Sequence, residues 1–142
     1  MEEYKKLLET AIESRKLSYS PYSHFAVGAA LLCSDGTVYT GCNIENAAYS
    51  PSICAERVAI FKALSENRRD FKAIAIAGGK SGEDFDGLCP PCGVCRQVLQ
   101  EFCSPSDFEV ILGSSGDNMK VLRLSEIFPF AFMPESIKKQ TE

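Results

Sequence analysis

Two short stretches carry the most informative residues of this chain: SICAER at residues 52–57 and PCGVCR at residues 91–96. The first supplies one cysteine and, two residues later, a glutamate, and the second supplies a Cys-x-x-Cys pair. Three thiolates beside a carboxylate that is not itself a ligand are typical of a zinc site that keeps its fourth coordination position open for water. The predicted ligands are Cys54, Cys92 and Cys95.

The residues next to these cysteines have chemical roles at such a site. If the cysteines occupy the first turns of two helices, the positive helix ends offset the net negative charge of zinc with three thiolates. Arg57 is placed to donate to a thiolate as a supporting contact, and we favour it over Arg96 for this role. Glu56 can take a proton from zinc-bound water and return protons to the substrate, so it is the predicted catalytic residue.

Two other uses of the cysteines are left open by the residues alone. One is a closed structural zinc site, in which Cys89 or Cys42 supplies a fourth thiolate. The other is a redox-active Cys-x-x-Cys pair. The redox interpretation leaves Cys54 and Glu56 unexplained, and three evenly spaced cysteines from residue 89 to residue 95 cannot easily reach one ion together. We therefore favour the open site.

Length and composition indicate a single domain with an ordinary core, since the chain has 142 residues of which 45% are hydrophobic and 24% charged. No apolar run is long enough to span a membrane, and the first residues are no secretory signal. Seven cysteines cannot all pair in a disulfide framework, so we expect reduced thiols and a cytoplasmic protein. A net charge of −4 and a pI near 5.1 disfavour nucleic acid as a partner, and no membrane partner is expected.

The order of apolar patterns predicts an α/β fold with a mixed β-sheet sandwiched between helices in three α/β/α layers. We expect Ser52 to cap the helix that carries the first cysteine. The chain is expected to form one domain over residues 1–142. The expected elements are a helix at 2–17, a hairpin at 25–41, a helix from 53, a strand at 71–77, a helix from 92, strands at 109–112 and 120–124, and a frayed tail at about 135–142.

The two cysteine stretches and three further blocks resemble the small, homotetrameric, zinc-dependent cytidine deaminases of pyrimidine salvage. The similarity covers residues 19–132 and implies hydrolytic deamination of free cytidine and deoxycytidine to uridine and deoxyuridine, with release of ammonia. In that reaction, hydroxide formed on one zinc ion per chain attacks C4 while the glutamate shuttles protons. The further blocks are Pro21-Tyr22-Ser23 with Phe25, Val27–Ala30 and Gly41–Ala47.

The resemblance also implies which residues contact the substrate. Asn43 and Glu45 would hydrogen-bond the ribose, chiefly its 3′-hydroxyl, whereas Phe25 would pack against the pyrimidine and Ala55 would offer backbone groups to the base. The residues alone leave other roles open. Asn43 and Glu45 are equally suited to capping their own loop, and an aromatic at the start of a strand usually belongs to the core.

A homotetramer is implied in which Ala47, Tyr49 and Phe132 reach the active site of a neighbouring subunit. An aromatic cluster near the C-terminus of a small acidic domain fits such an interface, although core packing accounts for part of it. The cluster consists of Phe128, Phe130, Phe132 and Met133.

The chain departs from the resembled pattern in two places. His24 stands where lysine or another polar residue is expected and is interpreted as a solvated loop residue, and the segment at 80–88 is longer and more acidic than typical. A second hypothesis is a related deaminase that acts on an aminonucleoside antibiotic, a nucleotide or a base within nucleic acid. A third is a zinc-stabilised structural or binding module without deaminase activity. The loop Asn43–Asn46 favours a nucleoside over the antibiotic. The short turn between the last two strands and the acidic pI disfavour a polynucleotide.

Overall fold

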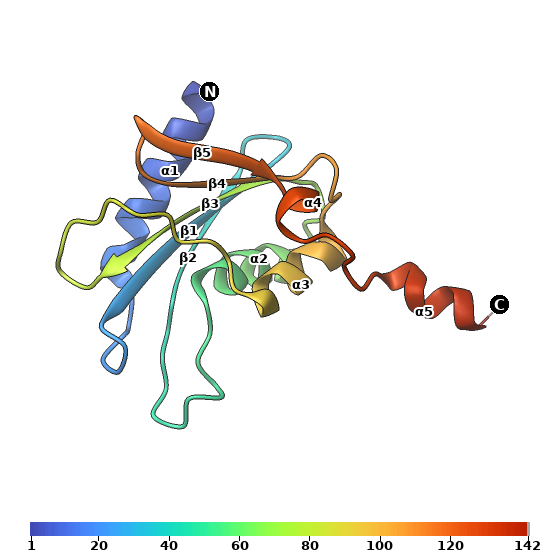
Figure 1. The fold of residues 1–142 in the computed structure, drawn as a ribbon, viewed down its shortest axis with the longest axis horizontal. Helices are drawn as coiled ribbons and strands as arrows, with labels where there is room; N and C mark the ends of the chain where they lie inside the picture. The colour runs from blue at the N-terminus through green and yellow to red at the C-terminus, as the bar shows by residue number, and fades with distance from the viewer. Residues whose placement is uncertain (142) are drawn as a thin grey trace.

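The computed structural model describes residues 1–141, with side chains described as far as residue 138. Its centre is a five-stranded sheet with the order β2-β1-β3-β4-β5 (Figure 1). The strands are β1 (Phe25–Cys33), β2 (Val38–Cys42), β3 (Phe71–Lys80), β4 (Glu109–Ser115) and β5 (Asn118–Arg123). The helices are α1 (Glu2–Ser14), a short 3₁₀ helix (Arg15–Leu17), α2 (Ala55–Ser65), α3 (Gly93–Phe102), α4 (Leu124–Ile127) and α5 (Pro134–Thr141).

The sheet is mixed, as the sequence predicted. Strand β1 pairs antiparallel with both β2 and β3, and β4 pairs antiparallel with β5. Strands β3 and β4 are parallel, and α3 lies in the connection between them. The β1–β2 turn contains Gly36 at a φ of 91°, a backbone conformation that glycine adopts without steric cost.

Helices cover both faces of the sheet, which gives the predicted three-layer arrangement (Figure 1). Strand β3 shows how the sequence specifies it, because successive side chains of a strand point to opposite faces. Ala73, Ala75 and Ala77 pack in one core with residues of α1, whereas Ile74 and Ile76 pack in a second core with residues of α2 and α3. The continuous apolar run at this position is therefore buried on both sides, as expected for a central strand.

Helix α2 begins two residues later than predicted. Ile53 forms a β-bridge with Ile44, with backbone hydrogen bonds of 3.0 Å in both directions, and Ser52 Oγ accepts the amide of Asn46 at 2.9 Å. Both residues are thus held in the loop, and Cys54 takes the N-cap position with φ −78° and ψ 153°. The prediction that Ser52 caps this helix was wrong, because a bridge between two distant loop positions leaves no local pattern in the sequence.

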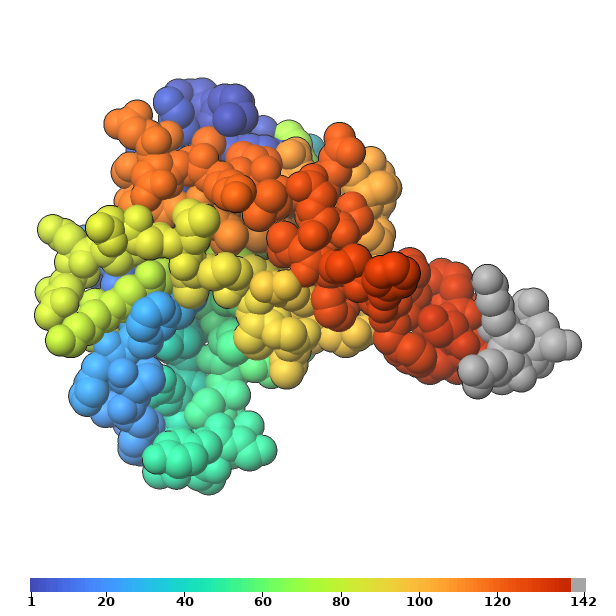
Figure 2. Space-filling model, viewed as in Figure 1, coloured from blue at the N-terminus to red at the C-terminus, as the bar shows by residue number. Residues whose placement is uncertain are grey.

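The end of β3 and the segment after residue 133 also differ from the prediction. Strand β3 continues past residue 77 to Lys80, because Lys80 and Gly79 still pair with the beginning of β1. Helix α5 occupies the segment predicted as a frayed tail. Pro134 is favourable at the first position of a helix, and Ser136 Oγ accepts the Met133 amide at 3.2 Å. Helix α5 projects away from the sheet and its covering helices (Figures 1 and 2).

The acidic segment at 80–88 folds back toward the end of α1. The Arg15 guanidinium lies 4.2 Å from the centroid of the Phe85 ring and donates to the carbonyl of Gly79 at 3.0 Å. Asn118 Nδ2 donates to the carbonyl of Asp86 at 2.9 Å. From this anchored segment the chain runs directly into the second cysteine stretch. Across residues 1–141, no helix combines the length and the apolar character that crossing a membrane requires.

Candidate metal centre and active site

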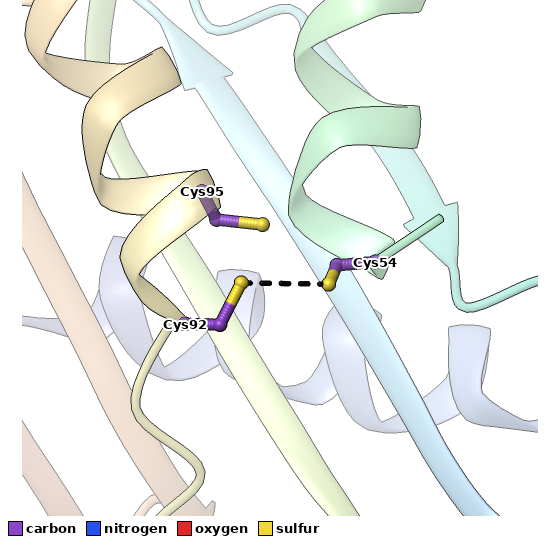
Figure 3. A group of neighbouring side chains, drawn as sticks. All are labelled: Cys54, Cys92 and Cys95. Atoms are coloured by element: carbon purple, nitrogen blue, oxygen red, sulfur yellow. Dashed lines mark hydrogen bonds between the residues drawn. The ribbon is translucent and has the colours of Figure 1, made fainter. Parts of the chain in front are cut away.

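The three predicted thiol ligands come together at the N-terminal ends of two neighbouring helices. Cys54 is the N-cap of α2, Cys92 is the N-cap of α3, and Cys95 lies in the first turn of α3. Figure 3 shows the three sulfur atoms pointing toward one another across the gap between these helices. The Sγ atoms lie within 4.8 Å of one another, and those of Cys54 and Cys92 are 3.7 Å apart.

This geometry fits zinc. A tetrahedral ion with Zn–S bonds of about 2.3 Å places its sulfur ligands about 3.8 Å apart, close to the observed separation of Cys54 and Cys92. Cys95 is buried whereas Cys92 is exposed, so the cluster has one covered side and one accessible side. Three thiols with an accessible side provide three of the four positions that zinc requires.

Neither cysteine considered as a fourth ligand joins this cluster. Within the described residues, the group of side chains able to hold one metal ion contains the three thiols and neither Cys89 nor Cys42. Cys42 Sγ donates to the carbonyl of Leu17 at 3.3 Å, and Cys89 packs over the backbone of Gly78. The arrangement therefore supports an open site over a closed site with four thiolates.

Glu56 lies in the first turn of α2, directly after the buried Ala55, and is itself only 4% exposed. Burial raises the pKa of its carboxyl to about 7, the negative charge of Cys54 contributes in the same direction, and a hydrogen bond with Cys95 opposes the shift. A carboxyl with a pKa near neutrality is suited to accept and to donate a proton in turn. Glu56 is not among the grouped metal ligands, which leaves its carboxylate available for proton transfer.

Arg57 contacts the thiol cluster and Arg96 does not. Arg57 Nη2 donates to Cys54 Sγ at 3.4 Å. Hydrogen bonds with Cys95, Arg57 and Cys92 lower the pKa of the Cys54 thiol to about 5, and the bond with Cys95 contributes most to this shift. Arg96 instead donates to backbone carbonyl groups at Pro91 and, across to α4, at residue 127. The positive charge of Arg57 thus favours the thiolate form that metal binding requires.

A cavity of about 270 Å³ opens beside the cluster, and six of the twelve predicted site residues line it: Asn43, Glu45, Cys54, Ala55, Glu56 and Cys92. We predicted no substrate contact at Val27, Ser52, Ile53, Cys89 or Pro90, and considered Cys89 only as a fourth metal ligand. Cys89 and Pro90 could have been predicted from their position just before the second cysteine stretch, because the chain that leads to Cys92 must pass along the cavity. The lining residues are Val27, Asn43, Glu45, Ser52, Ile53, Cys54, Ala55, Glu56, Cys89, Pro90 and Cys92.

Phe25 is not among the residues that line this cavity. It is 42% exposed, and its ring lies over Gly78 beside Cys89: a Cβ atom added at Gly78 would meet Phe25 Cε1 at 3.0 Å and Cys89 Sγ at 2.6 Å. Phe25 therefore borders the cavity wall through Cys89 in this single chain. The absence of a side chain at Gly78 is what lets the ring and the thiol lie there together.

Asn43 and Glu45 line the cavity while also holding their surroundings by hydrogen bonds. Asn43 Oδ1 accepts from the Val27 amide at 2.9 Å and from the Ser18 hydroxyl, and Asn43 Nδ2 donates to the carbonyl of Phe25 at 2.7 Å. The loop-capping role that the sequence left open is therefore present at Asn43. Asn43 also lines the cavity, so its role in holding the loop does not remove it from the candidate site.

Glu45 anchors the loop that precedes β1. Its Oε1 accepts from the amides of Tyr22 at 3.0 Å and Ser23 at 3.1 Å, and its Oε2 accepts from the Ser23 hydroxyl. These bonds lower the pKa of the Glu45 carboxyl, and the bond from the Ser23 hydroxyl contributes most. The nearby His24 is exposed on the same loop with a φ of 56°.

The residues predicted to contact a neighbouring subunit lie on the surface of the chain and do not line the cavity. Ala47 and Tyr49 belong to the loop between β2 and α2, whereas Phe132 lies on the segment between α4 and α5, in a different part of the molecule (Figure 1). Tyr49 is 72% exposed, and its ring meets that of Tyr22 edge to face, with centroids 6.0 Å apart. The Phe132 carbonyl accepts from Gln97 on α3 at 2.9 Å, and its ring is 58% exposed.

Comparison with known proteins agrees with this site. The model of the cytidine and deoxycytidylate deaminase zinc-binding region matches residues 1–110. The chain is 48% identical over 131 residues to a cytidine deaminase of Halalkalibacterium halodurans, covering 92% of this chain and 95% of that relative. It is 44% identical to a cytidine deaminase of Sporosarcina psychrophila, with 96% of each chain covered.

A crystal structure of cytidine deaminase from Burkholderia pseudomallei has a TM-score of 0.80 and 43% identity to this chain, covering 89% of this chain and 97% of that one. The chain therefore belongs to the family of cytidine and deoxycytidylate deaminases. The predicted fold class is confirmed, and so is the expectation of a zinc-binding region.

Proposed function

We propose that this chain hydrolyses free cytidine and deoxycytidine to uridine and deoxyuridine and releases ammonia. The observation that carries the proposal is the shared cavity, which brings the buried Glu56 and the thiols Cys54 and Cys92 together with the polar side chains Asn43 and Glu45. A proton-transfer group and a metal-ligand set thus share one small-molecule site with groups that suit sugar hydroxyls. Membership of the deaminase family is in keeping with this reaction.

Cys54, Cys92 and Cys95 would hold one zinc ion per chain, which would supply a Lewis acid able to acidify water at the cavity. Glu56 would accept one proton from the water and pass it to the ring nitrogen N3. It would then accept the proton of the hydroxyl group gained at C4 and pass it to the departing amine, which leaves as ammonia. Its burial and its pKa of about 7 suit both directions of transfer. Arg57, which donates to Cys54 Sγ, offsets the charge of the thiolates.

The unfilled hydrogen-bond capacity of Asn43 and Glu45 suits a nucleoside that is recognised through one hydroxyl group. Asn43 Oδ1 already has two donors and one Nδ2 hydrogen already has an acceptor, so one N–H remains for a ligand. The Glu45 carboxylate has three donors, which leaves about one lone pair of its four. One donor and one acceptor are the complement of a single hydroxyl group.

We assign this hydroxyl to the 3′ position, which cytidine and deoxycytidine share. Inside a polynucleotide the 3′ oxygen is esterified, so it has no hydrogen to donate to Glu45 and brings a phosphate charge toward a carboxylate. The same residues thus oppose nucleic acid as a substrate, in keeping with the net charge of −4. Nucleosides that lack the 3′-hydroxyl should be poorer substrates, because the site then keeps two unpaired polar groups.

We further propose a homotetramer in which Ala47, Tyr49 and Phe132 contact the substrate or loops of a neighbouring site. Support comes from the exposure of Tyr49 on the β2–α2 loop and of Phe130 and Phe132 near the C-terminus, because exposed aromatic rings on a small domain often mark interfaces. We propose a cytoplasmic location, since all seven cysteines are free thiols in the structure.

Ultraviolet absorbance tests the proposed reaction, because conversion of cytidine to uridine lowers it near the cytidine maximum. Purified zinc-loaded protein should convert cytidine and deoxycytidine. Treatment with a chelator should remove activity, and added zinc should restore it. Cytidine 5′-monophosphate and a cytosine-containing oligonucleotide serve as competing substrates. Conversion of either of these in preference to the free nucleosides, or no turnover with zinc bound, would overturn the proposal.

A further inference from the structure

Ser23 connects two of the proposed substrate residues, although it lies outside the main cavity lining. Its hydroxyl donates to Glu45 Oε2, and its amide donates to Glu45 Oε1 at 3.1 Å. The same hydroxyl accepts the amide of Phe25 at 3.1 Å. A single side chain thus fixes the carboxylate that borders the sugar site and the backbone from which the Phe25 ring projects.

The carboxylate of Glu45 has few other restraints. Apart from Ser23, its described donor is the amide of Tyr22, which binds the same oxygen, Oε1, as the Ser23 amide. The Ser23 hydroxyl is therefore the contact that sets the direction of Oε2, the oxygen with spare acceptor capacity. Glu45 also lines a second hollow with Tyr22, Ser23, Tyr49 and Ser52, so a carboxylate released from Ser23 has space to turn away.

We propose that Ser23 is a positioning residue for substrate selection: it holds Glu45 so that the free acceptor of Oε2 faces the 3′-hydroxyl of the nucleoside. The inference rests on the proposed function. Ser23 does not touch the reacting atoms, so its loss should weaken recognition of one hydroxyl and leave proton transfer by Glu56 intact.

Steady-state kinetics with cytidine and 3′-deoxycytidine test this assignment. In the unaltered protein, kcat/KM should be higher for cytidine, because only cytidine has the 3′-hydroxyl that pairs with the free N–H of Asn43 and the free acceptor of Glu45. Ser23→Ala should reduce that preference by roughly ten-fold, the typical effect of one hydrogen bond to a charged group. The loss should appear as a higher KM for cytidine, with the 3′-deoxy substrate little affected. Ser23→Thr keeps the hydroxyl and should retain most of the preference.

A matched control contacts the same loop from the segment that follows β3. Ser81 Oγ is 3.1 Å from Ser20 Oγ, so Ser81→Ala removes a side-chain contact of this loop without touching Glu45. The backbone bond from the Ser81 amide to the carbonyl of His24, at 2.8 Å, stays in place. Ser81→Ala should leave the preference for cytidine unchanged. Circular dichroism and thermal unfolding check that all three variants fold.

The outcomes separate the inference from the function on which it rests. If the unaltered protein converts cytidine but Ser23→Ala slows both substrates equally, Ser23 has only a structural role and the inference is overturned. Equal loss of preference in Ser81→Ala, or in Ser23→Thr, overturns it as well, since loop integrity alone would then explain the effect. No conversion of cytidine by the unaltered protein overturns the proposed function itself.

Discussion

At the scale of single residues, Arg57 is the cationic side chain that the described structure places against the metal ligands. Its contact with Cys54 Sγ at 3.4 Å offsets the charge of a cluster made entirely of thiolates. Arg57→Ala should weaken zinc retention by roughly 10- to 100-fold, as is usual when a group supporting a metal ligand is lost. Zinc content measured after dialysis against graded chelator concentrations checks this.

Lys62→Ala is the matched control for that experiment, because Lys62 is an exposed cation further along the same helix. It should retain zinc like the unaltered protein. Equal zinc retention in Arg57→Ala would show that the helix ends alone compensate the thiolate charge.

Residue spacing predicted that the three thiols lie together and that Glu56 lies beside them, and the structure shows both placements, because a metal site constrains residue type and separation together. The sequence could not show that Cys89, considered there as a possible ligand, lines the cavity and packs with Phe25 over Gly78. That contact joins three elements far apart in the chain. Nor could it reveal that Asn43 and Glu45 already have most of their hydrogen-bond capacity filled by the structure around them.

At the scale of elements, Gly41 of β2 seats the first turn of α2. A Cβ atom at Gly41 would lie 2.2 Å from the Ala55 carbonyl oxygen and 2.7 Å from the Ala59 nitrogen, both in the helix backbone. Gly41→Ala should therefore cost about 1–3 kcal/mol of unfolding free energy. It should also lower kcat, because the displaced turn carries Glu56. Denaturant unfolding and cytidine turnover measure the two effects.

Gly87→Ala is the control for this substitution, since a Cβ there meets nothing within 4 Å. It should leave both quantities nearly unchanged. Full stability and activity in Gly41→Ala would show that α2 can move outward without disturbing the site.

Arg68 joins the β1–β2 turn to the residue before β3 and makes stability depend on pH. Its Nη2 donates to Asp35 and Asp70, each at 2.8 Å, and these hydrogen bonds lower the pKa of both carboxyls. Because the folded pKa values lie below the unfolded value of about 3.9, the contacts stabilise the fold above pH 4. That contribution is lost as the pH falls below this value.

Arg68→Gln should accordingly lower the Tm at pH 7 and make a much smaller difference near pH 2. Thermal unfolding across this range provides the measurement. Arg69→Gln is the control, since Arg69 donates to backbone carbonyl groups in the described hydrogen bonds. A constant Tm difference at every pH would mean that Arg68 acts through packing and not through its carboxylate partners.

Element types were predictable where the apolar pattern is clear: α1 places Tyr4, Leu7, Leu8 and Ala11 at helical spacing, and β3 is a continuous apolar run that is buried on both faces. The start of α2 was not, because the bridge between Ile44 and Ile53 competes with the local capping preference of Ser52. Local preference yields where a long-range pair satisfies the same backbone groups.

At the scale of the whole molecule, the exposed aromatic rings lead us to expect assembly. Light scattering should give a mass near four times the chain mass of 15.6 kDa. Phe132→Ala should weaken the assembly and reduce cytidine turnover together, since Phe132 is proposed to reach a neighbouring site. Ile137→Ala removes another exposed apolar side chain, on α5, and serves as the control. A fully active monomer would contradict the proposed tetramer.

Zinc content and cytidine turnover of Glu56→Gln together test most directly whether this residue transfers protons at the metal site, with Glu101→Gln on the exposed face of α3 as the control. We expect one zinc per chain in both variants and a fall in turnover of roughly 10²–10⁴-fold in Glu56→Gln alone, because Glu56 is the proposed proton-transfer group at the open metal site. Loss of zinc from Glu56→Gln would make this residue a metal ligand, and undiminished turnover would place the proton transfer elsewhere.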